Sequence, residues 1–318
     1  MPGVAEVLAR RLRDGGGPGR RSDPYRLALA VEGGTSRGAV ATGMLLALDE
    51  LGAVGAFDAV YGASVGALGA AWLLAGRIAE GARTWWDPVA MGRVMNPRNL
   101  LRGRRFIDLD PLVGEGSPLT ADALWRVLAH GVAFHPLATD AATGRATDLA
   151  PYVRDVPTLR TALRASTAVP LLAGGPVRLA GRRYIDAGMA EPLPYRTALA
   201  QGASHVLLLR TRPATDLPAP PPLVQRLLVP WVLRRGAAGT LPAWYAQHAR
   251  RIAEEADLAA HPRVLSVRPA ADAPAVGIME RDPRRLREAV DTGRAALLTL
   301  HAAVSGREHG GAAEARVP

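Results

Sequence analysis

Short apolar runs alternate with longer segments of helical periodicity along most of the chain. The apolar runs end at glycine or polar residues, and their length and composition are typical of buried strands. The predicted strands and hairpins lie at 25–34, 57–64, 133–149, 177–188, 205–213 and 263–270. The predicted helices between and after them lie at 38–53, 65–77, 158–170, 194–203, 241–261 and 282–304.

This alternation predicts an α/β fold. Strands joined by helices form a mostly parallel central sheet that helices cover on both faces. In such a sheet, functional sites lie at the carboxyl ends of the strands. The polar and glycine residues that follow each predicted strand are therefore the first place to look for chemistry.

We expect one main domain, at 23–306, because no long linker interrupts the pattern. The proline-rich segment 214–225 is the best candidate for an internal break, but it is short and suggests a rigid loop. Residues 1–22 predict a short helix and a glycine-rich, flexible lead-in. Residues 307–318 predict a disordered tail.

Composition excludes several classes of protein. The chain of 318 residues is 48% hydrophobic, which fits a globular protein with a full core. It has no cysteine, so disulfides, zinc–thiolate sites and a cysteine nucleophile are excluded. The chain contains no run of about 18 apolar residues, so we expect no membrane-spanning helix. The first residues lack the apolar core of a signal peptide. A cytoplasmic location is the expectation.

The chain is strongly basic, with a formal net charge of +10, and all 39 of its basic residues are arginine. Such a charge could favour nucleic acid or an anionic membrane. The arginines are scattered among acidic residues, however, and do not cluster with aromatic ones. We therefore regard nucleic acid as an unlikely partner, and salt-sensitive retention of DNA or RNA would be its signature.

Ser64 lies where a predicted strand turns into a predicted helix. The sequence GASVG at 62–66 has glycine two residues to each side of the serine, at Gly62 and Gly66. This is the pattern of a nucleophile elbow, a tight turn that projects the serine hydroxyl. The following helix N-terminus places partial positive charge nearby, which favours a developing oxyanion. The alternative is a tight turn that only packs.

A second glycine-rich turn, EGGTSRG at 32–38, also joins a predicted strand to a predicted helix. Backbone N–H groups in such a loop can bind an anion. A dinucleotide-binding loop would need an acidic residue after the next strand, but that strand ends in the serine turn, and Asp49 and Glu50 fall within a helix. An oxyanion hole is the better interpretation, with a packing turn as the alternative. Its residues are Gly33, Gly34, Thr35, Ser36, Arg37 and Gly38.

Asp186 ends a predicted hairpin strand in YIDAG. A carboxylate beside a serine hydroxyl can act as its general base, although an isolated aspartate before a turn is usually a cap. A serine–acid–histidine triad would need a histidine in a loop after a strand. Of the histidines that follow Asp186, only His261 is in a plausible loop. The others are His205, His248, His301 and His309.

The three elements together resemble the patatin-like phospholipase family, whose pattern is a glycine-rich loop, then G-x-S-x-G, then D-G-[GA]. Here the corresponding residues are Gly33–Gly38, Gly62–Gly66 and Asp186-Ala187-Gly188. Flanking segments are also similar, at 138–144, 165–174 and 191–213. The resemblance spans most of residues 26–306.

The resemblance implies a three-layer α/β fold and a lipid acyl hydrolase with a Ser-Asp dyad. Ser64 would attack the acyl carbonyl, Asp186 would act as the base, and the glycine-rich loop would form the oxyanion hole. The implied substrate is a lipid ester, and no metal or organic cofactor is implied. The alternative is a catalytically weak lipid-binding or scaffolding protein with the same fold.

Two positions depart from the family pattern. Thr35 and Ala187 stand where glycine is usual. A β-branched residue resists positive φ, and alanine tolerates it poorly. We therefore expect a slightly different loop path, with reacting groups unchanged.

Two segments mix apolar, aromatic and basic residues. Residues 221–236 carry Trp231 beside leucines and arginines, around Pro230, and residues 84–97 carry two adjacent tryptophans. Each could lie in a membrane interface with arginines near anionic headgroups, or could pack on the core. Peripheral contact with an anionic membrane is therefore one possible interaction, and the sequence leaves the oligomeric state open.

Overall fold

The computed structural model describes residues 2–216 and 219–313, with the backbone alone for 305–313. Its strands form a single sheet in the order β5-β6-β3-β2-β1-β7-β8, and β4 also pairs with β3. Pairing is parallel from β3 through β2, β1 and β7 to β8, and antiparallel for β4, β5 and β6. The predicted mostly parallel sheet is confirmed. The strands are β1 (Leu27–Val31), β2 (Ala59–Ala63), β3 (Ala133–Asp140), β4 (Ala146–Asp148), β5 (Val177–Leu179), β6 (Arg182–Ile185), β7 (His205–Leu209) and β8 (Val264–Val267).

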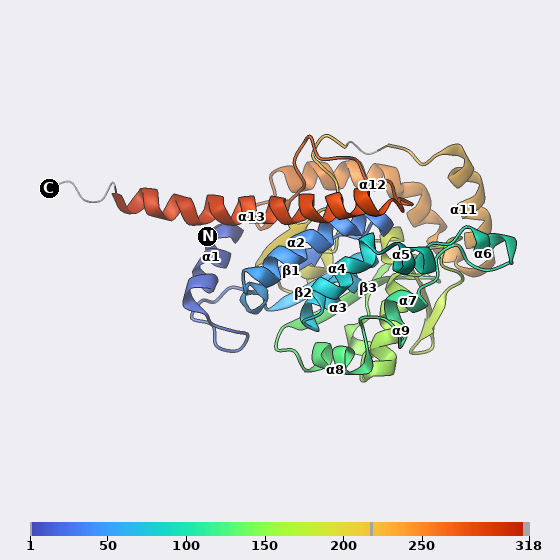
Figure 1. The fold of residues 1–318 in the computed structure, drawn as a ribbon, viewed down its shortest axis with the longest axis horizontal. Helices are drawn as coiled ribbons and strands as arrows, with labels where there is room; N and C mark the ends of the chain where they lie inside the picture. Colours follow the sequence, from blue (N-terminus) through green and yellow to red (C-terminus); the bar gives the residue numbers. More distant parts are fainter. Residues whose placement is uncertain (1, 217–218, 314–318) are drawn as a thin grey trace.

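Helices cover both faces of this sheet (Figure 1). The predicted helices are present, and several short ones lie between α3 and β3. The helices are α1 (Val4–Asp14), α2 (Gly38–Glu50), α3 (Val65–Leu74), α4 (Ile78–Trp86), α5 (Pro88–Val94), α6 (Arg98–Leu101), α7 (Asp110–Val113), α8 (Ala121–Ala129), α9 (Val156–Ser166), α10 (Tyr195–Ala200), α11 (Leu223–Gly236), α12 (Leu241–Ala259) and α13 (Pro283–Ala313).

The central strand β1 shows how the apolar sequence makes the layers. Successive strand side chains point to opposite faces of a sheet, and every residue of β1 is buried. Leu27, Leu29 and Val31 join the core formed with α2, α3 and α13, whereas Ala28 and Ala30 face α10 and α12. Because both faces are covered, the strand is apolar throughout and does not alternate.

The first helix is joined to the sheet by one buried arginine. Arg11, in α1, forms ion pairs with Asp23 and Asp58, each at 2.8 Å, and donates to the carbonyl oxygens of Ala56 and Tyr25. The hydrogen bond from Arg11 holds the pKa of the Asp23 carboxyl below its usual value. The start of the chain is therefore held by several charge-assisted hydrogen bonds, which are stronger than neutral ones.

The two ends of the chain compare differently with the predicted domain plan. The short helix expected within residues 1–22 is present as α1, and it packs on the main core. At the other end, α13 continues to Ala313, so the backbone of 307–313 is helical where we expected a disordered tail. Glycines at 306, 310 and 311 weaken a helix but keep its backbone hydrogen bonds, so they do not end it. Residues 314–318 of the predicted tail lie outside the described residues.

Replacing Arg11 with methionine tests whether α1 is part of the folded domain. The change keeps an apolar stem but leaves Asp23 without its ion-pair partner, whereas Asp58 keeps its pair with Arg21 at 3.1 Å. We expect the free energy of unfolding, measured by urea denaturation, to fall by about 3 kcal/mol, as for other broken buried ion pairs. As a control, Arg126→Met removes an exposed pair on α8 with Asp122 and should change the stability by less than about 1 kcal/mol. Similar values for the two variants would contradict the structural role of Arg11.

Candidate active site

Ser64 occupies the strand-to-helix turn that the sequence predicts. It follows β2, precedes α3, and has φ 54° and ψ −129°, a conformation that a non-glycine residue rarely adopts. A Cβ on Gly66 would lie 2.5 Å from the carbonyl oxygen of Val31, and one on Gly62 would lie 2.4 Å from the Cα of Ala67. Both glycines are therefore required by close backbone contact. Strain of this kind is concentrated at functional sites.

The pairing of β3 with its two neighbours brings Ser64 and Asp186 together. The last residue of β2 before Ser64 pairs with Leu137 in a parallel register, and Ile185, just before Asp186, pairs with Thr139 in an antiparallel register. Ser64 and Asp186 each follow these paired residues by one position. They therefore lie at the same level of β3, on opposite sides of it. The Ser64 hydroxyl donates a hydrogen bond of 2.6 Å to Oδ2 of Asp186.

The surroundings hold both groups in place. The Ser64 N–H donates to the Ser166 hydroxyl at 3.0 Å. Oδ1 of Asp186 accepts from the Gly188 N–H at 2.8 Å, and the Thr139 hydroxyl donates to the Asp186 carbonyl oxygen at 2.8 Å. Burial raises the pKa of Asp186 to about 6, although the hydrogen bonds from Ser64 and Gly188 act in the opposite direction. A carboxylate with this pKa is a stronger base than an exposed one.

Within the described part of the chain, no histidine is hydrogen-bonded to Ser64 or Asp186. His205 is buried at the opposite end of β7, with its ring nitrogens near the Ser204 hydroxyl and the carbonyl oxygen of residue 2. His261 packs against Tyr195, with ring centroids 6.2 Å apart. His248 and His301 lie on helices α12 and α13, and the side chain of His309 lies outside the described residues.

The glycine-rich loop of six residues lies beside Ser64, but only some of its backbone N–H groups lack an acceptor within the protein and could bind a ligand. The N–H groups of Gly33, Ser36, Arg37 and Gly38 donate to protein carbonyl oxygens. In the described structure, the N–H groups of Gly34 and Thr35 have no protein acceptor. These two amides are therefore available to a ligand.

The two departures from the glycine pattern have different consequences. Thr35 adopts φ 52°, so the loop keeps a left-handed residue despite the β-branched side chain. Ala187 begins a short helical turn, η4 (Ala187–Met189), and its φ is not positive. The expected strain therefore exists at Thr35 and is absent at Ala187.

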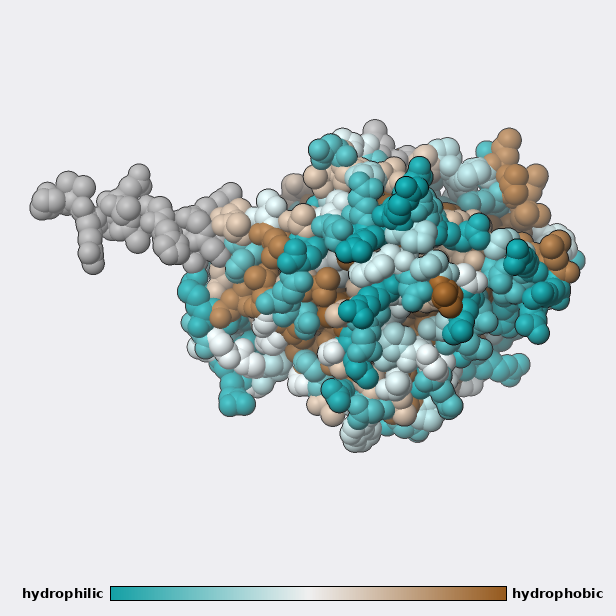
Figure 2. Space-filling model, in the orientation of Figure 1, coloured by the Kyte–Doolittle hydropathy of each residue, from teal (hydrophilic) through white to brown (hydrophobic). Residues whose placement is uncertain are grey.

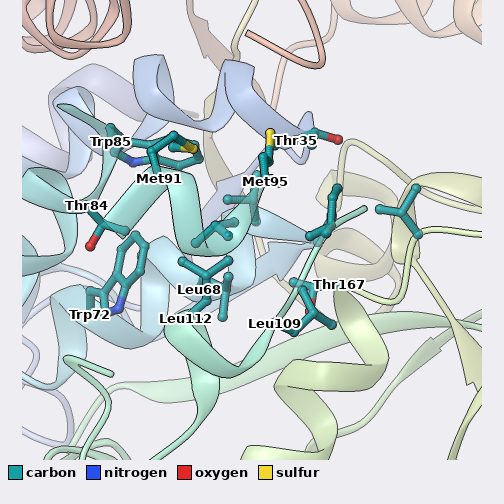
Figure 3. Close-up of a pocket in the computed structure, with 15 residues that line it drawn as sticks. Thr35, Leu68, Trp72, Thr84, Trp85, Met91, Met95, Leu109, Leu112 and Thr167 are labelled. Carbon is teal, nitrogen blue, oxygen red and sulfur yellow. The ribbon is translucent and has the colours of Figure 1, made fainter. Parts of the chain in front are cut away.

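A narrow apolar cavity of about 40 Å³ extends from Ser64 (Figure 3). Trp72, Trp85, Met91 and Leu109 are among its walls, and Thr35 and Thr167 also line it. Trp85 is 5% exposed, so this part of segment 84–97 packs inside the protein, one of the two roles considered for that segment. The cavity suits a slender apolar chain.

A second, polar cavity of about 240 Å³ shares Thr35, Ser64 and Val169 with the apolar one. Its wall combines the glycine-rich loop with residues after β7 and on α12. Burial raises the pKa of one wall residue, Glu254, to about 7. The charged residues that line this cavity are Arg37, Arg210, Arg212, Arg250, Arg251, Glu32, Asp186, Glu254 and Glu255.

The sequence analysis did not identify the residues of α12 that line the polar cavity. Gln247, Arg250 and Arg251 lie on a helix with no recognisable motif and more than 60 residues after Asp186. Ser166 and Thr139 were also missed as supports of the pair, although both lie in the segments similar to the family. The adjacent pair Arg250-Arg251 was the one available signal on α12. The described residues contain no group of three or more His, Asp or Glu side chains arranged to hold a metal ion.

Comparison with known proteins gives matches of two kinds. The chain is 30% identical over 203 residues to the uncharacterized protein YjjU of Escherichia coli (strain K12), over 61% of this chain and 54% of that protein. This chain therefore spans about half the length of that curated relative. Among solved structures, VipD from Legionella pneumophila is similar with a TM-score of 0.44 and 13% identity, covering 87% of this chain and 67% of that one. Human GIVD cytosolic phospholipase A2, solved with a fluorophosphonate inhibitor, has a TM-score of 0.39 and 14% identity, covering 95% and 62%.

The family model described as patatin-like phospholipase matches residues 29–199, which are 171 of the 318 residues. The matched region begins in β1 and includes the glycine-rich loop, the Ser64 turn and Asp186. Since the match extends over more than half of the chain, the protein belongs to the patatin-like phospholipase family.

Proposed function

We propose that the protein is a serine hydrolase that cleaves acyl esters of lipids with a Ser-Asp dyad. The observation that carries this proposal is the 2.6 Å hydrogen bond between Ser64 and Asp186, at the point where the apolar and polar cavities meet. Membership of the family supports a lipid hydrolase in general. The dyad and its individual residues are our assignment.

In the proposed reaction, the Ser64 oxygen attacks the acyl carbon and its proton passes to Asp186. The tetrahedral intermediate then expels the alcohol, which takes the proton from Asp186. This leaves an acyl ester on Ser64. Asp186 next removes a proton from water as the water oxygen attacks that ester. The second tetrahedral intermediate expels the Ser64 oxygen, which takes the proton back from Asp186, and the carboxylic acid is released. A base with a pKa of about 6 is mostly ionised at neutral pH and still strong enough to accept the proton.

Backbone N–H groups would stabilise the oxyanion formed in both steps. The unpaired amides of Gly34 and Thr35 are two candidates in the loop. The N–H of Val65, directly after the nucleophile, is a third, because it begins α3 and has no acceptor within the described residues. Donors fixed in this way are usually a large part of catalysis, since they need no reorganisation. The acyl chain would occupy the apolar cavity.

We also propose that α11 contacts anionic membranes. It packs on the core through Val229, Pro230 and Leu233, and Pro230 does not interrupt the helix. Its outer side exposes Leu223, Val224, Leu227, Leu228 and Trp231, by 48–74%. Figure 1 places α11 and α6 at one end of the molecule, and Figure 2 shows hydrophobic residues gathered at that end. Arginines flank them, and the Arg235 guanidinium stacks 3.3 Å from the centre of the Trp231 ring. No helix among the described residues is long and apolar enough to cross a bilayer.

Labelling with a fluorophosphonate probe tests the nucleophile. The parent protein should react, because the hydroxyl is held by a base beside free amides, and peptide mapping should locate the adduct at Ser64. Ser64→Ala should abolish labelling, whereas Ser36→Ala, in the neighbouring glycine-rich loop, should retain it. Undiminished labelling of Ser64→Ala would contradict the assignment. Lipid binding without labelling or turnover would favour a scaffolding protein.

The pH dependence of hydrolysis tests the base. Because Asp186 must be unprotonated to accept the serine proton, kcat/KM should be constant near neutral pH and fall as the pH drops below about 6. Asp186→Asn should lower kcat by about 10²-fold or more, as is typical for the loss of a general base. His261→Ala should have nearly the parent activity. Collapse of activity in a folded His261→Ala variant would contradict the dyad.

Binding to anionic vesicles tests the role of α11. Trp231→Ala combined with Arg235→Ala should weaken binding about tenfold, because it removes an exposed aromatic ring that would enter the membrane interface and an arginine worth about 1 kcal/mol. The matched control is Trp125→Ala with Arg126→Ala, which changes an exposed pair on α8. A short, soluble ester should be hydrolysed at the parent rate by both variants. If both double variants bound vesicles equally well, α11 would not be the membrane surface.

A further inference from the structure

Two methionines separate the apolar cavity from a groove on the outside of the protein. Met91 and Met95 are one helical turn apart, on α5 and directly after it, and both line the cavity that extends from Ser64. In Figure 3 they lie on one side of this cavity, with Leu68 and Leu112 on the other. The same two methionines also line the outer groove. A single layer of side chains therefore lies between the two spaces.

The outer groove lies between α5 and the segment that precedes α13. Its volume is about 500 Å³, and its other lining residues are Pro88, Gly92, Met279, Glu280, Arg281, Asp282 and Pro283. The side chain of Met279 is 44% exposed. The two carboxylates of the groove pair with arginines of α13, Glu280 with Arg285 at 3.2 Å and Asp282 with Arg284 at 3.6 Å. The methionines, prolines and glycine are thus left to contact an apolar ligand.

Backbone hydrogen bonds fix the outer wall of this groove to the glycine-rich loop. The Ser36 N–H donates to the carbonyl oxygen of Ile278 at 3.3 Å, and the Ser36 hydroxyl donates to that of Glu280 at 2.9 Å. The sulfur of Met95 lies 3.8 Å from the same hydroxyl oxygen, and a thioether is only a weak acceptor. The wall is therefore held by strong interactions, whereas the methionines between the two spaces are held mainly by packing.

The apolar cavity is too short for a long acyl chain. Its volume of about 40 Å³ has room for about three water-sized groups, since each needs about 10–15 Å³ of such space. A hexanoyl chain would fit, whereas a tetradecanoyl chain is longer than the cavity. Methionine is unbranched and has three rotatable side-chain bonds, so it adapts its shape more easily than a branched side chain. Met91 and Met95 are thus the part of the wall that opens most easily.

We propose that a long acyl chain passes between Met91 and Met95, and that its methyl end occupies the outer groove. The ester lies at Ser64, the first part of the chain fills the apolar cavity, and the remainder lies between α5 and Met279. This rests on the proposed hydrolase function and adds to it a binding site that selects for chain length. Each further methylene group that leaves water favours binding about fourfold, so the groove gives long chains an advantage over short ones.

The first arm of the test compares chain lengths in the active enzyme. The kcat/KM values for p-nitrophenyl tetradecanoate and p-nitrophenyl hexanoate are measured in the same neutral detergent micelles. Gly92→Trp places a large ring in the outer groove, where a Cβ at Gly92 would meet no atom within 4 Å. It also replaces a glycine within a helix, so it does not weaken α5. The ratio of the long to the short ester should fall at least about tenfold, the effect of returning about two methylene groups to water.

Val89→Trp is the matched control. It adds the same ring to the same helix, at a position that is 63% exposed and does not line the groove. Its ratio of long to short ester should equal that of the parent. A ratio that stays at the parent value in Gly92→Trp, or that falls equally in both variants, would overturn the groove as a binding site.

The second arm locates the methyl end of the chain in a protein that cannot turn over substrate. Tetradecanoic acid carrying a diazirine at its methyl end is bound to Ser64→Ala and cross-linked by light, and mass spectrometry maps the adducts. We expect adducts at Met279 and Pro283 that excess tetradecanoic acid removes. Adducts confined to Trp72 and Leu112, inside the apolar cavity, would show that the chain ends there and would overturn the proposal, as would the absence of any adduct that tetradecanoic acid removes.

The two arms distinguish failure of the groove from failure of the hydrolase. If neither ester is hydrolysed but competed adducts form at Met279, the hydrolase proposal fails and the groove stands as a site for a fatty acyl chain. If both esters are hydrolysed through Ser64 and the adducts remain inside the apolar cavity, the hydrolase proposal stands and the groove is overturned.

Discussion

The hydrogen bond between Ser64 and Asp186 depends on the position of β3, which is paired on one side with a parallel strand and on the other with an antiparallel one. A purely parallel sheet would carry the residues after each strand away from the sheet in the same direction. The antiparallel β6 instead reaches the active-site level as it ends, so that Asp186 meets Ser64 across β3. A shift of one residue in either register would turn a side chain to the other face and separate the pair.

Burial raises the basicity of Asp186 but disfavours its ionised form, so hydrogen bonds from the surroundings are needed to stabilise the carboxylate. The low dielectric around Asp186 raises its pKa, while the Gly188 N–H and the Ser64 hydroxyl keep its ionised form accessible. On the other side of Ser64, burial acts on arginines and lowers the pKa of Arg37. The same physical effect thus strengthens a base on one side of the nucleophile and disfavours the charge of a cation on the other.

The distribution of apolar surface agrees with the proposed location of the substrate. In the proposed reaction the acyl chain would lie in the apolar cavity inside the protein, and α11 exposes leucines and Trp231 on the outside. The inner side of α11 belongs to the same hydrophobic cluster as Ile185, the residue before Asp186. A lipid at a membrane surface would meet apolar, cationic and catalytic features within one end of the sheet.

The sequence by itself determined the strands, the helices and the three turns that carry the chemistry. Apolar runs and helical spacing are local, so they predicted the parallel sheet and its covering helices, and Ser64, Asp186 and the 33–38 loop each had a local signature. Tertiary structure decided which loop amides remain free, because the acceptors of the others come from distant residues such as Pro192 and Ile278. It also decided that α1 belongs to the core, since Arg11 meets Asp58 only after β2 is in place. Arg250 and Arg251 on α12 belong to no recognisable motif. Only the fold brings Arg251 into the same cavity as Arg37, where its charge acts on that side chain, because electrostatic interactions depend on distance in space and not on separation in sequence.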